Sequence, residues 1–129
     1  MKRKQRRICG AGIPVCLFAI AAFLAAPATA NEDAAMFAKQ CGVCHTLNAD
    51  EPRRQGPPLG GIIGRTAGKV DGFPYSKGLK AADWAWDEER LDEWLTNPKS
   101  LFSDTYMVYK QPDAGVRGQI IAFLKTAGE

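Results

Sequence analysis

The chain has 129 residues, which is enough for one small domain at most. Its 17 basic and 14 acidic residues give a formal net charge of +3, but five of the basic residues lie among the first seven positions. The positive excess therefore belongs to the N-terminus, and no cluster of Lys and Arg elsewhere indicates binding to nucleic acid.

The first thirty residues have the three-part layout of a secretory signal peptide. A basic stretch (1–7) precedes a mainly apolar run (8–26) and the small-x-small sequence Ala28-Thr29-Ala30. We expect cleavage after Ala30, export to the periplasm, and one mature domain (31–129) with a net charge of about −2. The alternative is an uncleaved membrane anchor, because the apolar run approaches the length that spans a bilayer.

The mature domain is predicted to open with a helix over 32–44 that presents the sequence Cys41-Gly42-Val43-Cys44-His45. A C-x-x-C-H sequence is the attachment signature of c-type haem. The two thiols add to the two vinyl groups of one porphyrin, and the imidazole ligates the iron from the proximal side. His45 is the only histidine in the chain, so no other imidazole competes for this place.

Two other readings of the cysteines are weaker. A thioredoxin-like dithiol is expected within a βαβ pattern, which is absent here. A structural zinc site needs four ligands, whereas the mature domain offers only Cys41, Cys44 and His45, because Cys9 and Cys16 leave with the leader. We therefore expect one haem c, covalently bound through Cys41 and Cys44. A domain of this size has a thin apolar core, so we expect the haem-free chain to be largely unfolded.

The remaining elements indicate an all-α domain. Residues 56–75 are too rich in glycine and proline for a long helix or strand. A helix is predicted to start after Asp87 as its N-cap and to stop at Asn97-Pro98, and a non-helical connection follows over 99–111. The last helix is predicted from about Asp113 to Thr126. The predicted apolar face of the first of these helices consists of Leu91, Trp94 and Leu95, and that of the last helix consists of Val116, Ile120, Phe123 and Leu124. Gly118 and Ala122 lie on a nearby face of the last helix, where small residues would allow a close helix crossing.

The second face of the iron needs its own ligand. In the mature domain only Met36 and Met107 offer a thioether. Met36 lies on the segment that holds the proximal side, where core packing is the better interpretation. Met107 lies in the predicted connection and can reach the far side. His45/Met107 ligation would raise the reduction potential and leave no open coordination position, which favours a one-electron carrier over an enzyme.

The mature chain resembles the class I c-type cytochromes, both bacterial cytochrome c2 and mitochondrial cytochrome c. The matching landmarks, in order, are Cys41-x-x-Cys44-His45, Gly56-Pro57-x-Leu59-x-Gly61-x-x-Gly64-Arg65, Gly72-Phe73-x-Tyr75, Trp86, Leu95-x-Asn97-Pro98-Lys99, Thr105-x-Met107 and Ile121-Ala122-Phe123-Leu124-Lys125. The resemblance implies a small all-α fold in which the N- and C-terminal helices cross and loops wrap around one covalently bound haem.

The resemblance also implies roles for residues outside the haem motif. Pro57 would accept the Nδ1–H of His45, and Phe37 and Phe123 would meet where the first and last helices cross. Tyr109 would line the exposed haem edge. The residues that would satisfy a buried haem propionate are Arg65, Tyr75, Trp86 and Thr105.

Some positions depart from the family pattern. Asp33 replaces a frequent glycine, so the helix crossing could shift toward Gly118. Leu79 replaces a polar residue near an internal water, which would dry the methionine side. Trp94 replaces a tyrosine that often donates to the methionine sulfur, and its Nε1–H can still donate.

The implied function is a soluble periplasmic electron carrier, a monomer that docks transiently through its haem edge. Its donor would be a membrane redox complex or a dehydrogenase, and its acceptor an oxidase or a photosynthetic reaction centre. An enzyme or sensor in which Met107 leaves the iron is the alternative. Gln40, Ser100 and Tyr106 stand where mitochondrial relatives tend to carry lysine, so electrostatic steering toward acidic partners should be weak.

Overall fold

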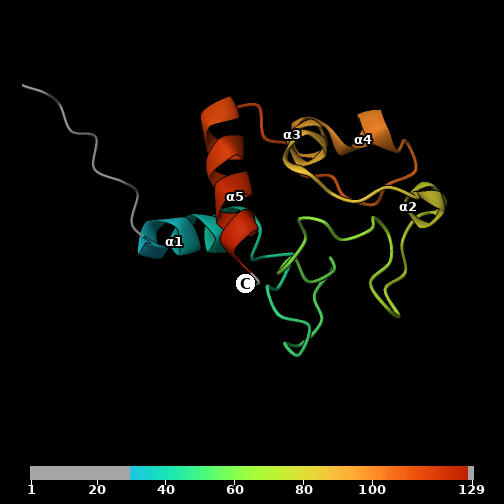
Figure 1. Ribbon diagram of the computed structural model, residues 1–129, viewed down its shortest axis with the longest axis horizontal. Helices are drawn as coiled ribbons and strands as arrows, with labels where there is room; N and C mark the ends of the chain where they lie inside the picture. Colours follow the sequence, from blue (N-terminus) through green and yellow to red (C-terminus); the bar gives the residue numbers. More distant parts are fainter. Residues whose placement is uncertain (1–29, 128–129) are drawn as a thin grey trace, which may run out of the picture.

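A computed structural model describes residues 30–127, which form helices joined by long loops (Figure 1). The helices are α1 (Ala30–Gln40), α2 (Lys77–Ala81), α3 (Glu88–Thr96), α4 (Pro98–Leu101) and α5 (Ala114–Thr126). No β-strand forms within the described residues, where a single antiparallel bridge joins Thr66 and Ala85. The predicted all-α class is confirmed. Residues 1–29, which carry nearly all of the predicted signal peptide, lie outside the described part.

The N- and C-terminal helices cross, with α5 standing across α1 (Figure 1). Phe37 is only 7% exposed, and its ring centroid lies 5.2 Å from that of Phe123. This is the aromatic contact that the resemblance implied. The expected close approach through Gly118 and Ala122 is wrong, because both residues are exposed and no described atom lies within 4 Å of a Cβ built on Gly118.

Helix geometry explains why the small residues of α5 do not form the crossing. At about 100° per residue, Gly118 and Ala122 lie roughly half a turn away from Ile120. The buried face of α5 is instead formed by Ile120, Ile121 and Leu124. The large side chains therefore face the core, and the small ones face solvent.

Helix α3 begins and ends where the sequence predicted. The side chain of Asp87 accepts the backbone N–H of Arg90 at 2.8 Å, as an N-cap does. The buried residues of this helix are Leu91, Trp94 and Leu95. Helix α3 packs on α5, and the ion pairs Arg117–Asp92 (2.7 Å) and Lys125–Glu88 (2.6 Å) join the two helices.

Three helices differ from the prediction. Helix α1 ends at Gln40 rather than at residue 44, because the N–H of Gly42 bonds to the carbonyl of Phe37 (3.0 Å) and closes the helix. Helix α2 was not expected. Helix α4 interrupts the connection that was predicted to be non-helical, and Pro98, which ends α3, occupies the first turn of α4, where its missing N–H costs nothing.

The loop-rich middle is attached to both ends of the domain. Leu59 and Gly60 donate their backbone N–H groups to Thr46 (2.9 Å) and Leu47 (2.8 Å), while Gly61 donates to Ala127 (2.7 Å). Gly68 has φ +68°, and a Cβ there would lie 2.0 Å from the carbonyl oxygen of Leu79. Glycine is therefore required where this loop passes α2. Within residues 30–127, no helix has both the length and the apolar character needed to span a bilayer.

Candidate haem-binding site

The two cysteines and His45 lie in a tight turn that follows α1. The backbone N–H groups of Cys44 and His45 both donate to the carbonyl of Cys41, at 3.0 and 2.9 Å. Cys41 is buried, Cys44 is half-buried, and both are free thiols. The turn therefore places two unpaired thiols and an imidazole together at the end of the first helix.

His45 is oriented by a hydrogen bond on one ring nitrogen. Its Nδ1 lies 2.7 Å from the carbonyl oxygen of Pro57, which can only accept, so Nδ1 carries the proton. Burial lowers the pKa of His45, and the bond to Pro57 opposes this shift only in part. The ring is therefore neutral near pH 7, with its Nε2 lone pair available to a metal.

Gly56 provides the space for the ring of His45. A Cβ on Gly56 would lie 2.2 Å from Cε1 and 2.4 Å from Nδ1 of His45. The backbone N–H of Gly56 also donates to the carbonyl of Cys44 at 2.6 Å, which brings the Gly56-Pro57 segment against the haem motif. The glycine thus lets backbone lie flat against the imidazole while Pro57 fixes its orientation.

The environment of the cysteines argues against a thiol-disulfide enzyme. Burial, and then the neighbouring Cys44, raise the pKa of Cys41 to about 11. A reactive dithiol needs a lowered pKa, because the thiolate is the nucleophile. Among the described residues, no group of three or more His, Cys, Asp or Glu side chains is placed to hold a metal ion. Neither alternative that the sequence left open gains support.

Met107 is held by contacts on its sulfur and on its backbone. Nε1–H of Trp94 donates to the sulfur of Met107 at 3.1 Å, which is the bond that the sequence allowed to Trp94. The backbone N–H of Met107 donates to Oγ1 of the buried Thr105 at 3.3 Å. Met107 is partly buried against the core, beside the indole of Trp94.

These donors fit a covalently attached, six-coordinate haem. Two free thiols at C-x-x-C spacing, an imidazole with a free Nε2, and a thioether fixed from another part of the chain are the groups that such a haem requires. The cradle that Gly56 leaves for His45 is further evidence, since a larger residue would displace the ring. A cavity of about 260 Å³ lies between residues 46–58 and 70–73. It is not the porphyrin site, because neither cysteine nor Met107 lines it.

Three of the four predicted propionate partners lie close together. The backbone N–H of Trp86 donates to the carbonyl of Arg65 at 3.0 Å, and the charge of Arg65 acts on the hydroxyl of Tyr75. Burial nevertheless raises the pKa of Tyr75, although its bond to the Val70 backbone and the charge of Arg65 oppose this. The side chain of Thr105 is buried and accepts the backbone N–H of Met107.

The guanidinium of Arg65 already has backbone partners. It donates to the carbonyl oxygens of Pro58 (2.7 Å) and Gly60 (3.2 Å). Burial lowers the pKa of Arg65, while the neighbouring Tyr75 opposes the shift. Arg65 therefore holds the glycine-rich loop in shape, and its role toward a propionate remains a prediction.

The sequence reading missed one polar cluster at this site. The hydroxyl of Tyr109 donates to Oε1 of Gln40 at 2.9 Å and accepts from Nε2 of Gln111 at 3.1 Å. Gln40 is the last residue of α1, next to Cys41, and Tyr109 lies 69 positions further along the chain. No periodicity or motif pairs residues at such a separation, so the only signal was the aromatic position of Tyr109.

The fold and the candidate site are together those of a small all-α domain whose thiols, imidazole and thioether fit a covalently bound haem. No family model matches the chain. Similar proteins include the cytochrome c of Ulva intestinalis, 39% identical over 106 residues that cover 80% of this chain and 94% of the relative. The cytochrome c of Chlamydomonas reinhardtii is 40% identical over 95 residues, covering 71% of this chain and 83% of the relative. The cytochrome c2 of Rhodomicrobium vannielii is 38% identical over 91 residues, covering 68% of this chain and 71% of the relative.

The chain belongs to the family of class I c-type cytochromes. Members of this family are electron-transfer proteins rather than enzymes, and they carry one haem c bound covalently through two cysteines. The class predicted from the ordered landmarks is confirmed.

Proposed function

We propose that this protein is a periplasmic one-electron carrier whose haem is bound through Cys41 and Cys44 and ligated by His45 and Met107. The observation that carries the proposal is the pair of fixed donors. The Pro57 carbonyl leaves Nε2 of His45 free, and Trp94 holds the sulfur of Met107 (2.7 and 3.1 Å). Among residues 30–127, no contact occupies Nε2 of His45, and the sulfur of Met107 accepts one hydrogen bond, from Trp94.

Each protein group has a separate effect on the electron that is carried. The haem, when bound, supplies a reversible one-electron change at its iron. The Pro57 carbonyl makes His45 a more basic ligand and fixes its ring plane. The indole of Trp94 withdraws electron density from the sulfur of Met107 and so weakens its donation. With His45 and Met107 both holding the haem iron, no position would remain for a substrate, and the site would carry electrons without bond chemistry.

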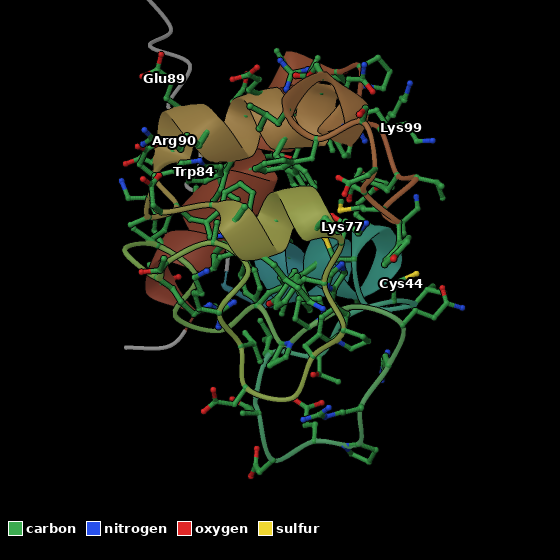
Figure 2. The ribbon with its side chains drawn as sticks, turned by 90° about the vertical axis from the view of Figure 1, so that its right-hand side faces the viewer. Cys44, Lys77, Trp84, Glu89, Arg90 and Lys99 are labelled. Carbon is green, nitrogen blue, oxygen red and sulfur yellow. The ribbon has the colours of Figure 1, made fainter. Side chains whose placement is uncertain are left out.

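The surroundings of Cys44 support a docking face at the haem edge. Figure 2 shows Cys44 and Lys99 toward one edge of the view, Lys77 nearer its centre, and Glu89 and Arg90 toward the opposite edge. Lys77 and Lys99 are exposed. The protein would act as a monomer that docks transiently through this face with a membrane redox complex or dehydrogenase as donor, and with an oxidase or reaction centre as acceptor.

The proposed docking face combines few charges with exposed apolar side chains. The large hydrophobic residues with the greatest exposure among those described are Val43 (77%), Tyr106 (76%) and Val108 (80%). Each lies within one residue of Cys44 or Met107 along the chain. Because apolar contact does not depend on salt, the association rate with a redox partner should fall only slightly with ionic strength. A steep salt dependence would contradict this picture of the surface.

The proposal is tested on the full chain, expressed in a bacterial host that can mature c-type cytochromes. Haem should remain on the polypeptide in a denaturing gel of the periplasmic fraction, and the ferric protein should show the far-red charge-transfer band of methionine ligation. Cys41→Ala and Cys44→Ala should lose covalent haem. Cys16→Ala, which changes only the predicted leader, should keep it.

Three results would refute the proposal. A colourless polypeptide from a competent host would exclude the haem, and haem found only with a membrane-bound precursor would exclude the free periplasmic carrier. A ferric protein without the far-red band, whose ferrous form binds carbon monoxide at once, would instead indicate an open-site sensor or enzyme.

A further inference from the structure

The hydroxyl of Tyr109 joins the two halves of the haem site. It donates to Gln40 at 2.9 Å, at the end of the helix that presents the cysteines, and accepts from Gln111 at 3.1 Å within its own segment. Tyr109 lies two residues after Met107. We call residues 107–111 the methionine strap. The Tyr109–Gln40 bond is therefore a direct hydrogen bond from the strap to the end of α1, next to the turn that carries the cysteines.

The far end of the strap is fixed independently. The backbone N–H of Gln111 donates to the carbonyl of Leu95 at 2.8 Å, and its own carbonyl accepts from Arg117 at 3.0 Å. The side-chain oxygen of Gln111 accepts the N–H of Asp113 at 3.1 Å. Gln111 is thus attached to α3 and to the start of α5, while its side-chain nitrogen orients the hydroxyl of Tyr109.

These contacts decide how the strap can open. If Gln111 stays attached to α3, Met107 can leave the haem only when the segment between them moves outward. Tyr109 lies in that segment, and its partner Gln40 cannot follow, because the next residue, Cys41, would be bonded to the haem. Opening therefore requires the Tyr109–Gln40 bond to break.

We propose that Tyr109, Gln40 and Gln111 form a latch that keeps Met107 on the iron, with Tyr109 as a positioning residue. The inference rests on the proposed ligation by Met107 and deepens it. It assigns to the hydroxyl of Tyr109 a function distinct from that of its ring, which the family resemblance places at the haem edge. Phenylalanine at this position would keep the ring and lose the latch.

The test uses imidazole as a competitor for the place of Met107 on the ferric holoprotein at fixed pH. The apparent affinity of imidazole is its intrinsic affinity multiplied by the fraction of molecules in which the strap is open. Loss of one neutral hydrogen bond should raise that fraction, and hence the apparent affinity, about fivefold in Tyr109→Phe. The matched control is Tyr106→Phe, an exposed tyrosine directly before the strap whose hydroxyl has no hydrogen-bond partner among the described residues, and it should bind imidazole like the unmodified protein.

A second variant and a double-mutant cycle distinguish the latch from a general loosening of the fold. Gln40→Ala, at a half-buried helix end, should raise the affinity by a similar factor, and the double variant should show no further increase, because both substitutions break one bond. If Tyr109→Phe does not accumulate as a folded protein, Gln40→Ala tests the same bond. A merely structural role would lower the denaturation midpoint and leave imidazole affinity unchanged.

The outcomes are distinguishable from those of the proposed function. Equal imidazole affinities for Tyr109→Phe and Tyr106→Phe, or fully additive effects of the two latch substitutions, would overturn the latch while the far-red band of the unmodified protein still supported Met107 ligation. Absence of that band from the unmodified protein would instead refute the ligation itself.

Discussion

Replacing Trp94 by phenylalanine isolates the effect of one hydrogen bond on the reduction potential. In the structure Nε1 of Trp94 lies 3.1 Å from the sulfur of Met107, and the indole is 8% exposed. The bond withdraws density from the sulfur and so disfavours the ferric state. Phenylalanine keeps an aromatic ring in the cluster and removes the donor. We therefore expect Trp94→Phe to lower the potential.

The size of the shift follows from the strength of the bond. A protein hydrogen bond contributes about 1 kcal/mol, and we assign about half of this to the difference between the two oxidation states. Because a tenfold change in the equilibrium constant corresponds to about 59 mV for one electron, the potential should fall by about 20 mV. This magnitude is resolved by a spectroelectrochemical titration of the purified holoprotein.

Trp84→Phe is the matched control for this experiment. Trp84 belongs to the same aromatic cluster, with ring centroids 4.9 Å from Trp86 and 6.1 Å from Phe102, and it contacts Arg90 rather than Met107. Its replacement should lower stability and leave the potential unchanged. Equal potential shifts in Trp94→Phe and Trp84→Phe would refute the reasoning, because the change would then reflect packing and not the bond to sulfur.

Three further predictions follow from the packing and the helix cap. Gly56→Ala places a Cβ 2.2 Å from the His45 ring, so the yield of haem-bound protein should fall. The control is Gly118→Ala, whose added Cβ meets nothing within 4 Å outside its own helix and should leave the haem content unchanged. Equal yields of haem-bound protein from the two variants would show that the ring of His45 does not need the space at Gly56. Phe37→Ala should lower the unfolding free energy by about 3 kcal/mol in a guanidinium titration, because it empties the α1–α5 contact, while the exposed Val43→Ala should change it by less than about 0.5 kcal/mol. The pKa of Asp87 lies below its ordinary value of 3.8, chiefly because the carboxylate accepts the N–H of Arg90. The ionised carboxylate of Asp87 therefore contributes its full stabilisation above pH 3.8, and this stabilisation is lost as the pH falls through the lowered pKa. The difference in unfolding free energy between the unmodified protein and Asp87→Asn should thus shrink below pH 3.8. A difference that does not change with pH would contradict the role of this helix cap.

The helices that were predicted correctly are those whose starts are set by neighbouring side chains. Helices α3 and α5 have side-chain caps at Asp87 and Asp113 and apolar residues at three- and four-residue spacing, and both were located within a residue or two. Helices α2 and α4, of five and four residues, are too short to show a period and were missed. The end of α1 depends on a bond from Gly42 back to Phe37, which does not alter the amphipathic pattern.

The candidate site likewise combines residues that the sequence predicts with contacts that only the fold reveals. Cys41, Cys44 and His45 are contiguous, so their chemistry is readable from the sequence itself, and Met107 followed by elimination among few methionines. The contact between His45 and Pro57 came from family resemblance, because a side chain bonded to a backbone carbonyl twelve residues away leaves no pattern in the sequence. The Tyr109–Gln40 bond spans 69 residues and depends on the whole fold, so only the structure could reveal it.

Ligation of the iron by Met107 is the central claim, and the ferric spectrum tests it most directly. The comparison is between Met107→Ala and Met36→Leu, since Met36 packs against the core and offers the other thioether of the mature domain. The far-red charge-transfer band should disappear in Met107→Ala and remain in Met36→Leu. A band that survives in Met107→Ala, or that is lost in Met36→Leu, would show that the sulfur on the iron comes from elsewhere and would contradict the account.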